Sequence, residues 1–236
     1  MIDTAMLMAA GLGKRMRPLT ATRPKPLVKV AGKPLMDHAL DRLEAGGIKK
    51  VVVNVHYLAD TVEAHLKARK GGLDFAISDE RAKLLETGGG LIHAKPLLGD
   101  QPFFCANSDN LWIDGPQETL AMMRRLWNPE KMDALLLLVP LARATCHTGP
   151  GDFHMAADGR LTRRKTAHVA PFVFTGVQIM SPALLVDPPA EVFSTNIFWN
   201  RAIAQDRLYG VSHQGLWFDV GTPKAIPVVE SMLAHG

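Results

Sequence analysis

The sequence predicts an α/β fold with a Rossmann-like, mixed but mostly parallel central sheet flanked by helices, and with a smaller second lobe. Short apolar strands alternate with helical patterns up to Leu141, and such alternation is typical of parallel sheets covered on both faces. After Leu141 the chain changes to Gly/Pro-rich turns and hairpin signals. We therefore expect a single domain over residues 1–236, with a core at about 1–141 and a lobe with a closing helix at about 142–236, continuous with the core sheet.

The elements of the core follow from apolar spacing. Strands are expected where apolar residues run together between turn residues: Thr4–Ala9, Val51–Val55, Asp74–Ser78, Pro102–Ala106 and Ala134–Leu141. Helices are expected where apolar residues recur three or four apart: one that Pro34 opens and Gly46 stops, then Ala59–Lys70, Gly89–Leu97 and Pro116–Trp127.

The second lobe begins with a hairpin signal. Asp158-Gly159 is a strong turn signal, and it predicts a hairpin over Gly151–Arg164. The remaining expected elements are strands at Pro171–Met180, Leu208–Ser212 and Trp217–Val220, and helices at Asn196–Ala204 and Pro223–Ala234.

Composition excludes several classes of protein. The formal net charge is 27 − 23 = +4 and aromatic residues make up 6%, which is weak support for nucleic-acid binding but is compatible with small anionic substrates. The longest apolar run, Ala134–Val139, is far short of the ~20 residues that span a bilayer. Cys105 and Cys146 imply no disulfide framework, and the N-terminus lacks a signal-peptide pattern. We expect a cytoplasmic protein without nucleic-acid or membrane partners, as a monomer or small homo-oligomer.

Three segments at the expected strand ends are candidates for a site, because ligands of such sheets bind beyond the carboxyl ends of the strands. They are Ala10–Arg15, Ser78–Gly90 and Asn107–Asn110.

The first of these segments has the features of a phosphate loop. Gly11 and Gly13 follow a strand directly and let the backbone approach a ligand, and Arg15 adds a fixed cation. Lys25 stands between two prolines that restrict its backbone. Neither a Walker A loop nor a dinucleotide fingerprint is present. An ordinary tight turn and a Pro-rich surface turn are the alternatives.

Ala9–Thr20 together with Pro24–Leu27 resembles the signature of sugar-1-phosphate nucleotidyltransferases, roughly G-x-G-[TS]-R-x-x-P-L-T followed by P-K-P. Lys14 stands where the family usually has Thr or Ser. The resemblance implies a glycosyltransferase-A-like nucleotidyltransferase fold whose second lobe binds the sugar. It implies catalytic roles for Arg15 and Lys25, and nucleotide binding by Ala9, Ala10, Gly11 and Gly13.

Two aspartates are the candidate metal ligands. Asp109 and Asp219 are single carboxylates at strand ends, and Mg²⁺ is commonly held by one or two carboxylates plus substrate phosphates. Relatives have Gly-Asp where Ser108-Asp109 stands, and a W-x-D-V/I-G-T-P segment like that around Asp219. The resemblance therefore implies Mg²⁺ as the cofactor. The alternative is that both are turn residues.

Base and sugar contacts are implied by the same resemblance. The Gly-rich segment before an expected helix suggests base contacts at Thr87 and Gly88, with Glu86 nearby, and a flexible loop is the alternative. Arg164 stands where many relatives have the sugar-binding Glu, and a cation there would suit a sugar with a carboxylate, such as N-acetylmuramate. A solvated basic strand edge is the alternative. The implied sugar-phosphate contacts are Asn110, Arg164, Lys165 and Gly176.

The expected reaction is transfer of a nucleotidyl group from an NTP, expected to be UTP, to a sugar-1-phosphate, expected to be N-acetylmuramate-1-phosphate. The products would be an NDP-sugar and pyrophosphate, and the implied role is nucleotide-sugar synthesis in peptidoglycan (cell-wall) recycling. The alternatives are a mannose-1-phosphate guanylyltransferase, a hexose-1-phosphate uridylyltransferase, or a non-catalytic module that binds nucleotide sugars.

Overall fold

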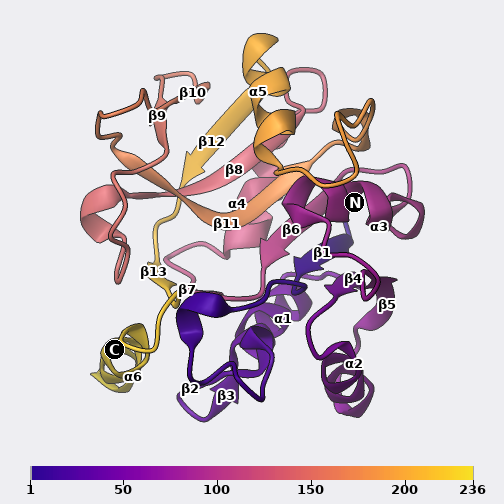
Figure 1. The fold of residues 1–236 in the computed structure, drawn as a ribbon. Coiled ribbons are helices and arrows are strands. Elements are labelled where there is room, and N and C mark those ends of the chain that lie inside the picture. Colours follow the sequence, from indigo (N-terminus) through magenta and orange to yellow (C-terminus); the bar gives the residue numbers. More distant parts are fainter. Residues whose placement is uncertain (1, 236) are drawn as a thin grey trace.

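The computed structural model describes residues 2–235 and is built on a nine-stranded sheet (Figure 1). Its core strands are β1 (Thr4–Met8), β4 (Lys50–Val55), β5 (Asp74–Asp79) and β6 (Phe103–Asn107). They lie in the order β6-β1-β4-β5, and every neighbouring pair among them is parallel. The predicted α/β fold with a mixed sheet and a parallel core is confirmed.

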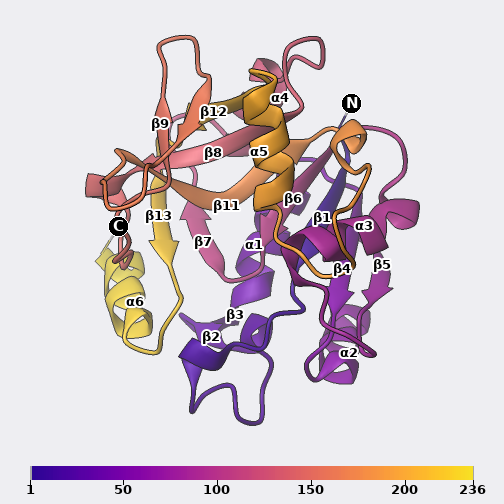
Figure 2. The same ribbon diagram turned by 45° about the horizontal axis from the view of Figure 1, so that its top comes forward.

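The second lobe continues this sheet. β11 (Phe172–Met180) runs antiparallel to β6 along one edge and to β8 (Ala134–Pro140) along the other, and β12 (Leu208–Ser212) pairs with β8. Next to β11 lies the hairpin of β9 (Phe153–Met155) and β10 (Leu161–Arg163), which joins the sheet where Phe153 pairs with Phe172 and whose turn projects outward in Figure 2. Core and lobe therefore share one set of strand hydrogen bonds.

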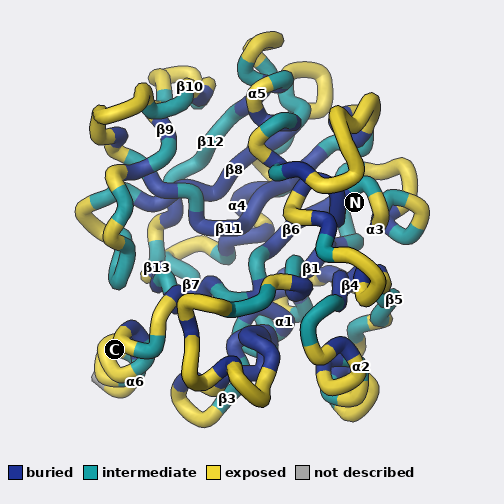
Figure 3. The backbone as a smooth tube through the Cα atoms, in the orientation of Figure 1, coloured by how far each residue is buried: buried dark blue, intermediate teal, exposed yellow. Residues whose placement is uncertain are grey.

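Helices cover both faces because successive strand residues point to opposite sides. Leu7 belongs to a buried cluster with α1 (Leu35–Ala45), α2 (Ala59–Ala68) and α4 (Thr119–Leu126). Met6, its neighbour, belongs to a cluster with α3 (Glu86–Leu98) and α5 (Asn196–Ala204). Figure 3 shows the central strands buried between these layers. Each fully buried large apolar side chain contributes about 1.5–3 kcal/mol.

A third, smaller cluster of buried apolar residues lies outside the main sheet. The antiparallel pair β7 (Asn110–Ile113) and β13 (Leu216–Asp219) packs with α6 (Ala225–His235) and with the segment that carries β2 (Lys29–Val30) and β3 (Lys33–Pro34). This arrangement brings the C-terminal end of the chain beside its N-terminal quarter (Figure 1). Within residues 2–235, no helix combines the length and apolar character needed to cross a membrane.

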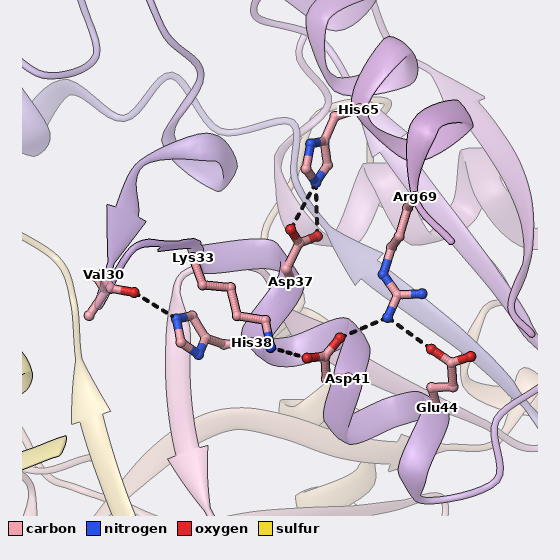
Figure 4. A network of polar contacts seen from close by, with 8 residues as sticks. All are labelled: Val30, Lys33, Asp37, His38, Asp41, Glu44, His65 and Arg69. Atoms are coloured by element: carbon pink, nitrogen blue, oxygen red, sulfur yellow. Dashed lines mark hydrogen bonds and ion pairs between the residues drawn. The ribbon is translucent and has the colours of Figure 1, made fainter. Parts of the chain in front are cut away.

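Charged residues tie α1 to α2 and to the turn after it (Figure 4). Arg69 donates to Asp41 at 2.8 Å and to Glu44 at 2.9 Å, while Lys33 also pairs with Asp41. The backbone N–H of Gly72 and then the Arg69 guanidinium lower the pKa of Glu44 below its usual range. Such partly exposed pairs contribute little each, about 0–1 kcal/mol.

The structure departs from the expected elements at several places. β2, β3 and β7 lie outside the expected strands. α4 begins at Thr119 rather than Pro116, because the Glu118 side chain caps it by accepting from the N–H groups of Leu120 and Ala121. α3 begins at Glu86 rather than Gly89, and its glycines lie inside the helix.

Candidate active site

A pocket lies beyond the carboxyl ends of β1, β4, β5 and β6, where a parallel sheet is expected to bind its ligand. It brings together residues from both Gly-rich segments and from the loop after β6. Seven of the predicted site residues line it: Ala9, Ala10, Gly11, Lys25, Glu86, Thr87 and Asp109. The sequence-based grouping of three strand-end segments is thus realised in space.

The two glycines of the first loop do different things. Beside Gly11 there is open space, so its backbone is accessible from the pocket. Gly13 has a left-handed φ of 60°, and a Cβ there would lie 2.9 Å from Cβ of Lys25. Gly13 does not line the pocket; it allows the loop to pack against Lys25.

Lys25 brings a buried cation into the pocket lining. Its side chain is 11% exposed, and its ammonium group pairs with the carboxylate of Asp109. The short 3₁₀ turn Lys25–Leu27 fixes the backbone, with the N–H of Leu27 donating to the carbonyl of Pro24 at 2.9 Å. A buried charge is stable only when it is paired with an opposite charge. The carboxylate of Asp109 supplies that partner and so stabilises the charged form of Lys25.

The β7–β13 pair places the backbone of Asp219 near that of Asp109. Asp219 lies opposite Asn110, the residue after Asp109. A Cβ on Gly221 would lie 2.9 Å from Oδ1 of Asp219 and 3.2 Å from Nη1 of Arg15, so that carboxylate and that guanidinium lie on the same side of Gly221. Arg15 and Asp219 stand beside the pocket, not in its lining.

The donor set suits a hard cation that completes its shell with substrate oxygens. The Asp109 and Asp219 side chains are 29% and 25% exposed, which leaves carboxylate oxygens accessible. Within residues 2–235, no group of three or more His, Cys, Asp and Glu side chains forms a closed cage. Proteins commonly bind Mg²⁺ in an open site of this kind, with one or two carboxylates and the phosphates of the substrate. The carboxylates of Asp109 and Asp219 therefore fit Mg²⁺ in ligand type and accessibility.

A histidine and a cysteine lie beside Asp219. Nδ1 of His147 is 3.4 Å from Oδ2 of Asp219, and its Nε2 is buried with no hydrogen-bond partner in the described part of the chain. Burial, followed by the nearby Asp219 charge, raises the pKa of the Cys146 thiol. Sequence reasoning missed His147, since its spacing to other ligand types carries no signal.

The base side of the pocket is built differently from the expectation. Glu86 and Thr87 are exposed in the pocket, but Gly88 is buried and does not line it. The N–H groups of Gly88 and Gly89 both donate to the carbonyl of Phe193, at 2.8 and 3.1 Å. The structure gives Gly88 a packing role under Phe193, and its contact with a base stays a prediction.

Two of the predicted sugar-side residues, Asn110 and Gly176, contact each other. Asn110 Nδ2 donates to the carbonyl of Thr175 at 2.5 Å, and a Cβ on Gly176 would lie 2.2 Å from this nitrogen. Gly176 has a φ of 87° and lies in the irregular part of β11 between Phe174 and Gln178. The bulge thus depends on a glycine that leaves room for the amide.

The basic pair after β10 lies outside the pocket lining. Arg164 donates from Nε to the carbonyl of Gly151 at 3.0 Å, and from Nη1 to the carbonyls of Lys165 and His168 at 3.2 and 3.0 Å. Arg164 therefore holds its own loop together, while Lys165 is exposed. Substrate contacts of both residues stay predictions.

Among the buried polar residues of the pocket, Asn54 lies outside the candidate segments of the sequence analysis, and Glu80 lies within Ser78–Gly90 but was not singled out there. Asn54 and Glu80 each have only 2% of their surface exposed, and both line the pocket. A signal for Asn54 was present, because it is the one amide in the otherwise apolar run Val51–Val55. A polar residue inside a buried strand needs a hydrogen-bonding partner.

Three comparisons with known proteins all find nucleotidyltransferases. A family model described as "Nucleotidyl transferase" matches residues 4–145. The chain is 47% identical to an N-acetylmuramate alpha-1-phosphate uridylyltransferase of Caulobacter vibrioides over 98% of this chain and 97% of that protein. It is 39% identical to a protein of the same name from Neisseria meningitidis, covering 92% and 93% of the two chains. The solved inositol-1-phosphate CTP transferase of T. maritima superposes with a TM-score of 0.78 at 17% identity, covering 99% and 95%, and shares the fold.

Proposed function

The chain belongs to the nucleotidyl transferase family, and from that premise we propose that it joins UTP and N-acetylmuramate-1-phosphate to give UDP-N-acetylmuramate and pyrophosphate. The observation that carries the proposal is the 47% identity, over nearly the whole chain, to a uridylyltransferase for that sugar phosphate. The pocket in which Lys25, Asp109 and the glycine loop meet supports the chemistry.

The reaction needs positioning and charge neutralisation more than a protein nucleophile. A phosphate oxygen of the sugar phosphate attacks the α-phosphorus of UTP and forms the new P–O bond. The bond to the β-phosphate breaks, and its electron pair leaves with pyrophosphate. Because the attacking oxygen is already anionic, no serine, cysteine or general base is required.

The cations of the site would neutralise the negative charge that develops on the phosphates in this step. Lys25 would turn from Asp109 to the α-phosphate, where negative charge increases. Arg15, exposed beside Asp219, would neutralise the departing pyrophosphate. Asp109 and Asp219 would hold Mg²⁺, which when bound supplies Lewis-acid neutralisation of the phosphates. The backbone at Gly11 would admit the triphosphate.

The sugar carboxylate would be recognised by Arg164. Its Nε and Nη1 groups are committed to backbone carbonyls, whereas Nη2 has no protein partner within residues 2–235. A guanidinium held in this way presents its remaining N–H groups in a fixed direction. The UDP-sugar would then enter peptidoglycan recycling in the cytoplasm, with the enzyme as a monomer or small homo-oligomer.

The test is pyrophosphate release with Mg²⁺, crossing UTP, GTP, CTP, ATP and dTTP with the 1-phosphates of N-acetylmuramate, N-acetylglucosamine, glucose and mannose. We expect the highest kcat/KM for UTP with N-acetylmuramate-1-phosphate. A clear preference for GTP with mannose-1-phosphate, or for UTP with glucose-1-phosphate, would replace the substrates. Nucleotide binding without turnover of any pair would contradict the enzymatic proposal.

Arg164→Glu tests the sugar side separately, with Arg163→Glu as the control. Arg163 donates to Asn196 and Asn200 and stacks on Trp199, away from the pocket lining. We expect only Arg164→Glu to reduce the preference for N-acetylmuramate-1-phosphate over glucose-1-phosphate. An unchanged preference would remove Arg164 from sugar recognition.

A further inference from the structure

Two buried polar side chains connect the two walls of the nucleotide pocket. The N–H of Ala9 donates to Oδ1 of Asn54 at 2.7 Å, and Nδ2 of Asn54 donates to Oε1 of Glu80 at 2.8 Å. The other carboxylate oxygen of Glu80 accepts from the N–H of Leu85 at 3.2 Å. A continuous chain of hydrogen bonds thus runs from the end of β1 to the residue that precedes α3.

Between β1 and β4 this series of hydrogen bonds begins where the backbone pairing ends. Met8 is the last residue of β1 in register with β4, where it pairs with Asn54. The Asn54 amide then links β4 to the N–H of Ala9 on this side and to the Glu80 side chain on the other, where the pairing of β4 with β5 continues to Val55 and Asp79. Both residues are 2% exposed, and buried polar groups of this kind need hydrogen-bonding partners.

Gly90 of α3 packs directly against the hydrogen-bonded side chains of Asn54 and Glu80. A Cβ on Gly90 would lie 2.8 Å from Oε1 of Glu80 and 3.1 Å from Nδ2 of Asn54. Only a glycine at this position of α3 therefore lets the helix lie directly on the pair. Glu80 must also be a double acceptor, since both of its partners are N–H groups.

The groups joined in this way carry the opposite sides of the nucleotide site. Ala9 leads into Ala10 and Gly11, which line the phosphate side, and Leu85 leads into Glu86 and Thr87, which line the other. We infer that Asn54 is a positioning residue for the nucleotide, which through Ala9 and Glu80 fixes the distance between these two walls. This inference rests on the proposed function and identifies a residue that sets nucleotide affinity and base selectivity.

The test uses Asn54→Asp, which keeps the side-chain shape and the acceptor for Ala9 but replaces the donor to Glu80 with a second carboxylate. Glu80→Gln is a second, uncharged variant that removes one of the two acceptors. We expect each variant to raise the KM for UTP about tenfold. The KM for the sugar phosphate at saturating UTP should change less than about twofold, and the preference for UTP over CTP should fall.

Gln178→Glu is the matched control. Gln178 is 3% exposed in the same sheet and accepts from Nε1 of Trp199 at 2.8 Å, but it does not line the pocket. The same amide-to-carboxylate change there should lower Tm without a selective rise in the KM for UTP. Equal rises in both KM values for Asn54→Asp and Glu80→Gln, or the same pattern in Gln178→Glu, would overturn the inference.

Calorimetric titration of UTP into the wild type and the variants separates this inference from the proposed function. UTP binding that weakens about tenfold in the two pocket variants supports the positioning role even if no sugar phosphate is turned over. Unchanged UTP affinity in folded Asn54→Asp and Glu80→Gln contradicts it even if the wild type is an active uridylyltransferase.

Discussion

The ammonium group of Lys25 lies against the carboxylate of Asp109, although the two residues are 84 positions apart in the chain. The pair joins the proposed catalytic cation to a proposed metal ligand. In the proposed reaction Lys25 would turn to a substrate phosphate, which would leave the carboxylate of Asp109 free to hold Mg²⁺. Until then the pair compensates the buried ammonium group of Lys25 and the partly exposed carboxylate of Asp109.

Lys25→Met should lower kcat for pyrophosphate release by about 10²–10³, equivalent to ~2.7–4 kcal/mol of transition-state stabilisation. The cause is the loss of a cation that is already held in place. Steady-state kinetics with saturating substrates measure it, and Lys29→Met, an exposed lysine on β2, is the control. A kcat within threefold of the wild type in Lys25→Met would remove Lys25 from the catalytic groups.

Asp109→Asn and Asp219→Asn should each raise the Mg²⁺ concentration needed for half-maximal activity by about tenfold or more, because each removes a charged oxygen ligand. Excess EDTA should abolish turnover in the wild type. The exposed Asp100→Asn is the control and should leave the Mg²⁺ dependence unchanged. If either Asp109→Asn or Asp219→Asn has the wild-type Mg²⁺ dependence, that aspartate is not a metal ligand.

Gly13→Ala and Gly11→Ala should differ in kind. At Gly13 the left-handed φ and the Cβ of Lys25 both oppose a side chain, so we expect about 1–3 kcal/mol lower unfolding free energy together with weaker activity. At Gly11 there is room, so stability should be nearly unchanged while the KM for UTP rises. Urea unfolding combined with kinetics tests the contrast, and equal losses of stability would refute it.

Acid should destabilise the protein through His213, whose ring is 1% exposed. Burial holds the pKa of His213 below its usual 6.5, and the carbonyl of Leu216 offsets only part of this effect. The unfolded chain therefore binds this proton more readily than the folded one. The unfolding free energy should be highest above about pH 6.5 and should decrease as the pH falls below that value. Urea unfolding from pH 8 to 5 measures the slope. His213→Gln should show a shallower decrease, and an unchanged slope would exclude His213 as its source.

Local sequence signals predicted the elements that depend on local spacing. α5 and β12 occupy the expected residues, and the hairpin turns at Asp158-Gly159 as its dipeptide predicts. β7 could not be found in this way, because Asn110–Ile113 is short and its partner β13 lies about a hundred residues further along the chain. The same holds for α3, whose early start depends on Phe193.

In the site, as in the fold, the sequence predicts the features that depend on residues close together in the chain. The glycine loop and Lys25 are adjacent in sequence and carry a recognisable pattern, and the structure places Lys25 in contact with Asp109. The burial of Gly88 under Phe193 and the backbone bonds of Arg164 were not predictable, because they depend on segments that meet only in the folded chain. Side-chain type indicates what a residue can bind, whereas tertiary packing decides which partner it meets.

The carbonyl of Phe193 completes the first turn of a helix that belongs to the other half of the chain. Two amide groups of the N-terminal half would lose this acceptor if residues 142–235 were removed. Because the acceptor is a backbone carbonyl, a chimera joined at Leu141 would keep the helix start only if its new second half presents a carbonyl at the position of Phe193. An exchange of the second half therefore has to preserve this backbone contact as well as change the sugar side.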